Sequence, residues 1–366
     1  MKKSLIALAV LAASGAAMAQ SSVTLYGVAD AAVTYVNGLD NWTGLNSGAN
    51  KTSRLGFRGV EDLGGGLKAN FVLEGAFNLD AGDGKNSGAT GTGFEFKRQS
   101  TVGLAGNFGE VRLGRELTAA YNATARYDVF GSVGIARSQL WEDGKKLDPK
   151  TFADPYRYTT DRRVSNAITY VSPNFSGFKA AVNYGFGEIA GKNSDGRYFG
   201  GGLTYDNGPL SLGLGAERLN NGAGAAMQVQ ASNDITAWSL GGSYDLGVAK
   251  LLAGYRQSTA KDVLGLGDLK NRGYMLAATA PVGPGLVRAA YNRYEAKFDG
   301  DKGVTDQFGL GYVYNLSKRT SVYGTYAYIK NKNDNALNLN LTVNSSGGVK
   351  SNGSQQAVQV GITHAF

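Results

Sequence analysis

Arginine side chains recur on one face of alternating segments in this sequence. In "TSRLGFRG", Arg54 and Arg58 lie on the face opposite Leu55 and Phe57, because successive side chains of a strand point to opposite faces. A guanidinium stays protonated at any relevant pH and is weakly hydrated, so a water-facing row of arginines attracts anions. The chemistry that these residues offer is electrostatic.

Side chains for catalysis are scarce. The absence of Cys excludes thiol catalysis, Cys-based zinc sites and iron–sulfur clusters. His364, the only histidine, shares an apolar strand face with Ile362 and Phe366, and no base–nucleophile pair is indicated by spacing. We find no phosphate cradle, metal constellation or nucleic-acid module, so we expect no catalytic residues, no metal, no cofactor and no nucleic-acid partner.

The first residues resemble a secretory signal peptide. Lys2 and Lys3 precede the apolar run "LIALAVLAA", and "AMA" at 17–19 supplies small residues for cleavage before Gln20. We therefore expect a signal peptide at residues 1–19 and one domain at residues 20–366. The formal net charge of +8 for the whole chain becomes +6 without Lys2 and Lys3. This basic excess is consistent with solubility or with a path for anions.

Segments of alternating apolar and polar residues run along the whole chain, and helical periodicity is not sustained. "FKAAVNYGF" places Phe178 and Val182 opposite Lys179 and Asn183, and "VRAAYNRY" opposes apolar residues to Arg288 and Asn292. No run approaches the ~18 apolar residues of a membrane-spanning helix. Contact with a membrane would therefore have to come from strands.

Short and long connections alternate between these segments. Gly, Asn, Asp and Pro mark short turns at 61–66, 106–109, 172–177, 206–209, 245–249, 282–285 and 315–319. Longer polar stretches lie near 37–50, 79–93, 116–161, 188–196, 220–233, 260–270, 298–303 and 331–354. Seven turns and eight loops predict sixteen strands.

An even number of strands with short turns at one end and long loops at the other is typical of an outer-membrane β-barrel. A sheet in hydrocarbon must close on itself because an unpaired backbone group there costs several kcal/mol. A soluble β-sandwich also alternates, but it does not account for the regular rhythm, the signal peptide and only 6 Pro residues. We predict an all-β, transmembrane antiparallel barrel in the outer membrane of a Gram-negative cell.

The sequence closely resembles the general porins of beta-proteobacteria over essentially the whole mature chain. The resemblance rests on "SSVTLYGVADAAVTYV", "SRLGFRGVEDLGGGLKANFVLEG", "RQSTVGLAGNFGEVRLGRE", "YVSPNFSGFKAAVNY", "YNLSKRTSVYGTYAY" and "VQVGITHAF". It implies a homotrimer of sixteen-stranded barrels, each with its own pore, in contact with outer-membrane lipid and lipopolysaccharide. It also implies that the long third loop, 116–161, folds into the pore and that Phe366 is an assembly signal read by the outer-membrane insertion machinery.

The resemblance further implies three arginines at the pore constriction, which match Arg54, Arg98 and Arg163. Alternation supports Arg54, and it supports Arg163, because Val164, Ile168 and Tyr170 are expected to face lipid. Arg98 shares the parity of Val102, which would place it outside unless a bulge breaks the register, so this residue rests on the resemblance alone.

Other charged residues are expected on the water-facing side. Glu74 faces inward by alternation and is expected to balance the arginines, and Arg58, Arg112 and Lys68 are expected further along the pore wall. Asp128, Glu142 and Asp143 are candidates for an opposing acidic patch on the loop.

The leading functional hypothesis is a general diffusion porin for small hydrophilic solutes and ions with a weak anion preference. A substrate-specific channel for phosphate or organic acids shares the fold, and saturable flux would distinguish it. The third hypothesis is an outer-membrane barrel enzyme, which a lipid or peptide hydrolysis assay would test.

Overall fold

The computed structural model describes residues 22–38, 40–84, 93–141, 160, 162–188, 190–191, 194–220, 234–263, 267–298, 300–332, 341 and 353–366. The predicted signal peptide, 1–19, lies outside the described residues. The strands are β1 Ser22–Asn37, β2 Trp42–Ser47, β3 Arg54–Gly64, β4 Leu67–Asn78, β5 Asp83–Gly84, β6 Gln99–Gly106, β7 Gly109–Leu117, β8 Arg163–Val171, β9 Phe178–Gly185, β10 Tyr198–Asn207, β11 Leu210–Asn220, β12 Asp234–Asp245, β13 Lys250–Ala260, β14 Leu269–Val282, β15 Gly285–Phe298, β16 Asp301–Asn315, β17 Thr320–Lys332 and β18 Ser354–Ala365. One α-helix, α2 Ala119–Thr124, and two 3-10 turns, η1 Ala125–Tyr127 and η2 Gln139–Trp141, follow β7.

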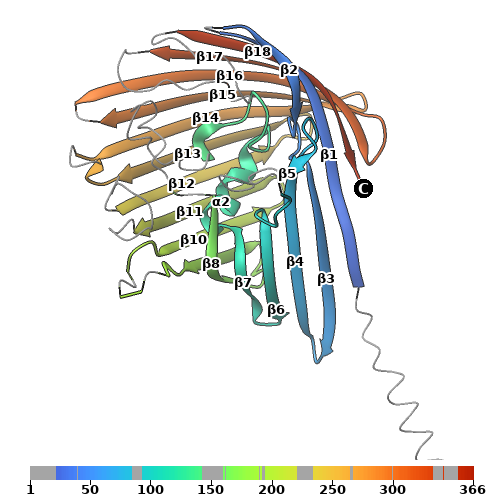
Figure 1. The fold of residues 1–366 in the computed structure, drawn as a ribbon, viewed down its shortest axis with the longest axis vertical. Helices are drawn as coiled ribbons and strands as arrows, with labels where there is room; N and C mark the ends of the chain where they lie inside the picture. Colours follow the sequence, from blue (N-terminus) through green and yellow to red (C-terminus); the bar gives the residue numbers. More distant parts are fainter. Residues whose placement is uncertain are drawn as a thin grey trace, which may run out of the picture.

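These strands form one antiparallel sheet that closes on itself (Figure 1). β1 pairs with β18 on one side and with β2 and β3 on the other. Because β2 and β3 follow one another along β1, they act as one interrupted strand, and β5 is a two-residue addition to β4. Within the described part of the chain, the wall therefore has sixteen strands, which confirms the predicted barrel.

The closing seam is continuous to Phe366. The N–H of Phe366 donates to the carbonyl of Gly27 at 3.1 Å, and the N–H of Gly27 donates back to the carbonyl of Phe366 at 3.1 Å. The backbone groups of both strands are thus paired, as a sheet in hydrocarbon requires. None of the described helices has the length and apolar character needed to cross a membrane.

The two faces of the wall differ as the alternation predicted. On β18, Val358, Val360 and Ile362 are exposed on the outer face, with Val360 62% exposed, whereas Gln359 and Thr363 on the inner face are 2% exposed. Exposed Leu, Val, Phe and Tyr side chains recur on the outer faces of the other strands. Such a continuous apolar exterior suits lipid rather than water.

All seven predicted short turns lie between consecutive strands. The expected long stretch at 298–303 is wrong, because β15 continues to Phe298 and β16 begins at Asp301. The two strands pair up to their ends, through Phe298 and Asp301, so this connection is a tight hairpin.

The loop after β7 packs against the inner wall. α2 contacts β9, β10, β11 and β12, and glycines on the inner wall allow the close approach. A Cβ at Gly202 would overlap the main chain of Ala119, and one at Gly254 would lie 2.8 Å from the ring of Trp141. The predicted third loop therefore folds into the barrel over residues 118–141, while residues 142–159 and 161 lie outside the described residues.

Candidate functional site

Glu74 on β4 joins two of the predicted arginines. The Nε of Arg98 donates to Glu74 Oε1 at 2.6 Å, and the Nε of Arg54 lies 3.4 Å from Glu74 Oε2. The hydroxyl of Tyr26 on β1 donates to the same Oε2 at 3.1 Å. Two guanidiniums thus share one carboxylate on the inner wall, which leaves one positive charge in excess.

The strand boundary explains how Arg98 reaches this cluster. β6 begins at Gln99, so Arg98 precedes the regular alternation that points Val102 and Leu104 outward. The main-chain N–H of Arg98 still donates to the carbonyl of Glu74 at 3.1 Å. The prediction that alternation places Arg98 on the outer face is therefore wrong, because it assumed that the strand already includes Arg98, whereas β6 begins at Gln99.

Arg163, at the start of β8, lies beside Arg98 and donates from Nε to the carbonyl oxygen of Arg98 at 2.8 Å. The expected outward direction of Val164 is wrong, since Val164 is buried with Ala167 and Tyr198. A register shift between β7 and β8, with Asn166 at φ 53°, interrupts the alternation there. Arg163 comes next to Arg98 through this irregular strand end, not through regular alternation.

A cavity of about 300 Å³ lies between this cluster and the tip of the inward loop. Its lining residues are Asn50, Lys51, Thr52, Arg54, Arg98, Asp128, Val129, Phe130, Gly131, Val133 and Arg288. Four cations and one carboxylate belong to this lining, and Glu74 behind it adds a second carboxylate, so the net charge is +2. The walls of the cavity are polar and positive on the arginine side.

Asp128 lies in the cavity lining together with Arg54 and Arg98, but its carboxylate is hydrogen-bonded within the loop itself. Its carboxylate accepts the main-chain N–H groups of Phe130, Ser132 and Ser138 at 2.9–3.0 Å. Burial raises the pKa of the Asp128 carboxyl, and these hydrogen bonds act in the opposite direction. Asp128 therefore shapes the loop tip. The other two candidates, Glu142 and Asp143, lie outside the described residues.

Arg288 on β15 contacts the loop tip from the inner wall. It is 8% exposed, its guanidinium carbon lies 4.8 Å from the ring centroid of Phe130, and Nη1 lies 3.4 Å from the carbonyl oxygen of Val129. The alternation of β15 predicted that Arg288 points inward, but no sequence pattern indicated that the loop tip reaches it.

Asp30 on β1 positions the break between β2 and β3, and sequence reasoning missed it. Its Oδ1 accepts the N–H of Ala49 at 2.6 Å and the N–H of Asn50 at 3.2 Å, and its Oδ2 accepts the N–H of Lys51 at 3.2 Å. The hydroxyl of Tyr323 on β17 also donates to Oδ1 at 2.9 Å. The available signal in the sequence was an aspartate within an otherwise apolar strand segment. By accepting the N–H of Lys51, the Asp30 carboxylate holds Lys51 at the cavity.

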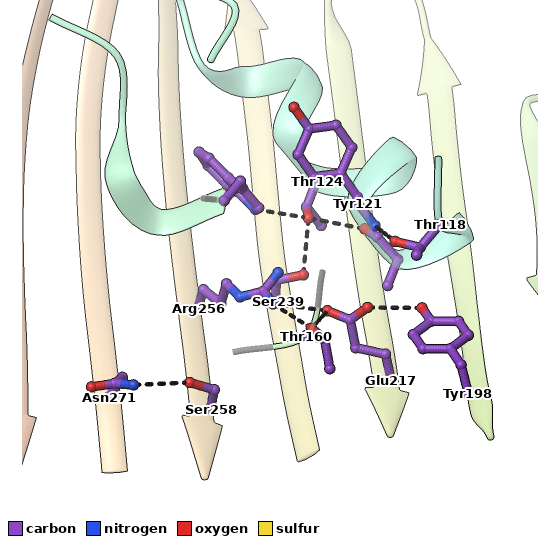
Figure 2. A network of polar contacts seen from close by, with 12 residues as sticks. Thr118, Tyr121, Thr124, Thr160, Tyr198, Glu217, Ser239, Arg256, Ser258 and Asn271 are labelled. Atoms are coloured by element: carbon purple, nitrogen blue, oxygen red, sulfur yellow. Dashed lines mark hydrogen bonds and ion pairs between the residues drawn. The ribbon is translucent and has the colours of Figure 1, made fainter. Parts of the chain in front are cut away.

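A second polar network holds the other end of the loop (Figure 2). Arg256 Nη2 lies 2.8 Å from Glu217 Oε1, which also accepts the hydroxyl of Thr160 at 2.5 Å. The hydroxyl of Tyr198 donates to Glu217 Oε2 at 2.8 Å. Figure 2 shows these side chains on the wall beneath α2, where Thr124 meets Ser239 at 2.9 Å.

The remaining predicted residues lie away from the cavity. Arg58 is exposed, with its guanidinium carbon 5.3 Å from the ring centroid of Tyr26, and Lys68 is exposed near the short-turn end of β4. Arg112 lies 2.9 Å from Glu110 and 2.8 Å from Glu116. Two carboxylates therefore surround Arg112, so its charge adds no positive excess to the wall.

The sequence matches the family model "Gram-negative porin" over residues 5–334. It is 47% identical to outer membrane porin protein 32 of Delftia acidovorans, with all of both chains covered. It is 31% identical to an outer membrane porin protein of Bordetella pertussis, over 90% of this chain and 95% of the relative.

Solved structures agree with these matches. The anion-selective porin from Comamonas acidovorans superposes with a TM-score of 0.81 at 43% identity and covers 95% of this chain and 100% of its own. The trimer form of OmpT from Vibrio cholerae, at 18% identity and a TM-score of 0.65 over 94% of this chain and 99% of its own, shows likeness of fold. The closed barrel, its inward loop and these similarities lead to one conclusion: the chain belongs to the Gram-negative porin family of the outer membrane.

Proposed function

We propose that this porin is a general diffusion pore for small hydrophilic solutes and ions with a weak preference for anions. Arg54, Arg98 and Arg163 are the selectivity residues of this proposal, and Glu74 partly neutralises them. The observation that carries it is the positive excess around the cavity, where Lys51 and Arg288 join the arginines. The anion selectivity for which the Comamonas porin is named supports the same preference.

Charges at this position act on every permeating ion. The electrostatic screening length at physiological salt is about 8 Å, which is comparable with the width of a cavity of about 300 Å³. At an effective dielectric constant of 20, two unit charges ~4 Å apart interact by roughly 4 kcal/mol. A few fixed cations can therefore favour anions strongly while leaving the passage open to neutral solutes.

The test is a reversal-potential measurement in planar bilayers with a KCl gradient. Wild-type protein is expected to pass chloride more readily than potassium, and the double variant Arg54→Gln/Arg98→Gln is expected to move the reversal potential toward potassium. Lys318→Gln is the matched control, because Lys318 is exposed in the turn between β16 and β17 and far from the cavity in the fold. An unchanged reversal potential in the double variant would refute the assignment.

A substrate-specific anion channel is the second candidate, favoured by the same cluster of four cations around one open cavity. Flux that saturates at micromolar phosphate or organic acid would support it, whereas flux linear in concentration supports general diffusion. Because the matched relatives are porins, we infer no enzymatic role.

Export, assembly and partners form part of the proposal. Residues 1–19 act as the cleaved signal peptide, so sequencing of the mature protein should begin at Gln20. The pore is a homotrimer, in keeping with the trimer form of the OmpT structure, and Phe366 is read by the outer-membrane insertion machinery. Exchange of Phe366 for Ala should lower the yield of heat-resistant trimer in the outer membrane without changing total synthesis.

A further inference from the structure

The first part of the inward loop, residues 118–141, is attached to the inner wall by contacts between buried polar side chains. The indole N–H of Trp141 donates to Thr124 Oγ1 at 3.1 Å, and Thr124 Oγ1 lies 2.9 Å from Ser239 Oγ on β12. Each of these three residues is at most 1% exposed. We call residues 118–141 the outgoing arm of the loop, and Figure 2 shows it seated on the wall.

Thr160 belongs to the arm by which the loop returns to β8, and it is attached to the same wall. Its hydroxyl donates to Glu217 Oε1 on β11 at 2.5 Å and accepts from Arg256 Nη2 on β13 at 2.7 Å. The two arms are joined at their base, since the N–H of Thr118 donates to the carbonyl of Arg162 at 3.0 Å. Restraint of Thr160 by Glu217 therefore also acts on the outgoing arm.

Glu217 and Arg256 form an ion pair that the loop covers. Glu217 Oε1 lies 2.8 Å from Arg256 Nη2, and the two side chains are 2% and 6% exposed. The other carboxylate oxygen of Glu217 accepts the hydroxyl of Tyr198 at 2.8 Å. A buried ion pair is favourable only when further hydrogen bonds complete it, so the pair depends on Thr160 and holds Thr160 in turn.

The negative charge of Glu217 strengthens all three of these contacts. Hydrogen bonds to a charged oxygen are roughly twice as strong as those between neutral groups. In Glu217→Gln the amide keeps one oxygen for Thr160 and Arg256, whereas its NH2 group replaces the oxygen that accepts from Tyr198. The variant therefore weakens the hold on Thr160 without a change in side-chain size.

A voltage across the membrane supplies a force against which this hold can be measured. Within residues 118–141, Arg126 and Arg137 are accompanied by one acidic residue, Asp128, so the outgoing arm has a net charge of +1. A charged segment in the transmembrane field is pulled along the membrane normal. Because the outgoing arm lies inside the barrel, its displacement from the wall narrows the path for ions.

We propose that Glu217 is a positioning residue, which keeps the inward loop seated on β11 to β13 and thereby keeps the pore open under voltage. Glu217 is buried beneath the loop, so it acts through the loop and not on a permeating ion. The proposal rests on the proposed diffusion pore but not on its preference for anions.

The test measures the ratio of closed to open channels in planar bilayers as the voltage is raised. Loss of a hydrogen bond to a charged group changes an equilibrium by roughly 10–100-fold, and Glu217→Gln is expected to raise the closed-to-open ratio by about that factor at a given voltage. Asp234→Asn is the matched control. Asp234 lies 2.8 Å from Arg218, the exposed neighbour of Glu217 in the chain, and an exposed ion pair contributes little, so the ratio should stay close to that of wild type.

Thr160→Val tests the same contact from the side of the loop. It removes the hydroxyl and keeps the ion pair of Glu217 with Arg256, so it should raise the closed-to-open ratio in the same direction. This variant leaves the wall unchanged, and it therefore decides the matter where Glu217→Gln assembles poorly.

A reversible tether distinguishes movement of the loop from other effects of the substitution. Thr124→Cys/Ser239→Cys places two thiols where the hydroxyl oxygens lie 2.9 Å apart, in a chain with no other Cys. Formation of this disulfide in the Glu217→Gln background should restore the wild-type ratio, and a reductant should abolish the rescue.

A closed-to-open ratio in Glu217→Gln and Thr160→Val equal to that of wild type overturns the proposal. A ratio that stays high while the disulfide is intact overturns it as well, because closure would then not require the outgoing arm to move. Wild-type protein that conducts no ions at any voltage would instead refute the diffusion pore itself.

Discussion

At the scale of single residues, Glu74 controls how much of the charge of Arg54 and Arg98 reaches a permeating ion. Its carboxylate contacts both guanidiniums, at 3.4 Å and 2.6 Å. Glu74→Gln removes this negative charge and keeps the size of the side chain, so the local net charge rises by one. We expect the chloride-to-potassium permeability ratio to increase several-fold, as measured by reversal potentials.

The conservative change Glu74→Asp is the control for this experiment, because it retains the charge and should leave the ratio near that of wild type. A fall in anion preference in Glu74→Gln would mean that Glu74 acts mainly by holding the arginines in place.

Asp30 is the second residue whose charge has a defined consequence. It is completely buried and accepts hydrogen bonds from the segment that carries Lys51 and from Tyr323. Asp30→Asn keeps the shape but weakens charge-assisted hydrogen bonds and introduces a donor among donors, at a cost of roughly 2–4 kcal/mol. We expect unfolding of the variant at lower denaturant concentration, followed by tryptophan fluorescence. Asp245→Asn, in an exposed position at the end of β12, should unfold like wild type.

At the scale of elements, the inner wall is matched to the loop that covers it. Gly202 on β10 faces α2, whereas the adjacent Gly201 faces outward, where an added Cβ would meet nothing closer than 3.7 Å. Gly202→Val should push α2 toward the passage, at a packing cost of ~1–3 kcal/mol, and lower the single-channel conductance. Gly201→Val is the neighbouring control and should conduct like wild type. Equal conductance in the two variants would contradict close seating of α2 on this strand.

The same scale separates what the sequence could predict from what it could not. Strand alternation placed Arg54, Glu74 and Arg288 on the inner face, since their strands are regular there. Alternation predicted the wrong face for Arg98, which precedes the start of β6. It also failed at Val164, because a register shift between β7 and β8 changes which face the side chains there point to. The meeting of Arg288 with Phe130 depends on how a long loop packs, and no local pattern encodes that contact.

At the scale of the whole molecule, the fold follows almost entirely from sequence. Short turns and alternating faces predict an antiparallel sheet. Because every backbone group must be paired in the hydrocarbon of a membrane, this sheet must close on itself. The cavity was predictable only in outline, since its lining residue Arg98 was supplied by the resemblance alone. Lys51 was not predicted, because its place depends on hydrogen bonds between Asp30 and the break after β2.

Selectivity of the whole pore should depend on salt. The screening length falls from about 10 Å at 0.1 M to about 3 Å at 1 M ionic strength, so fixed cations lose influence over an ion that keeps to the middle of the passage. We expect the chloride-to-potassium permeability ratio to approach that of bulk solution at 1 M KCl, in reversal-potential measurements at a constant concentration gradient. A ratio independent of salt would indicate ions in direct contact with the guanidiniums.

The seam between β1 and β18 has a consequence for how the molecule is made. Asp30 and Thr363, hydrogen-bonded across it, are 333 residues apart in the chain. Contacts of such separation form late, because the intervening polypeptide must first be confined. Until then β1 and β18 are edge strands with unpaired amide and carbonyl groups, which can pair with strands of other chains. Transit to the membrane is thus the stage at which this chain is most prone to aggregate, and protection by a holding chaperone matters there more than the stability of the finished ring.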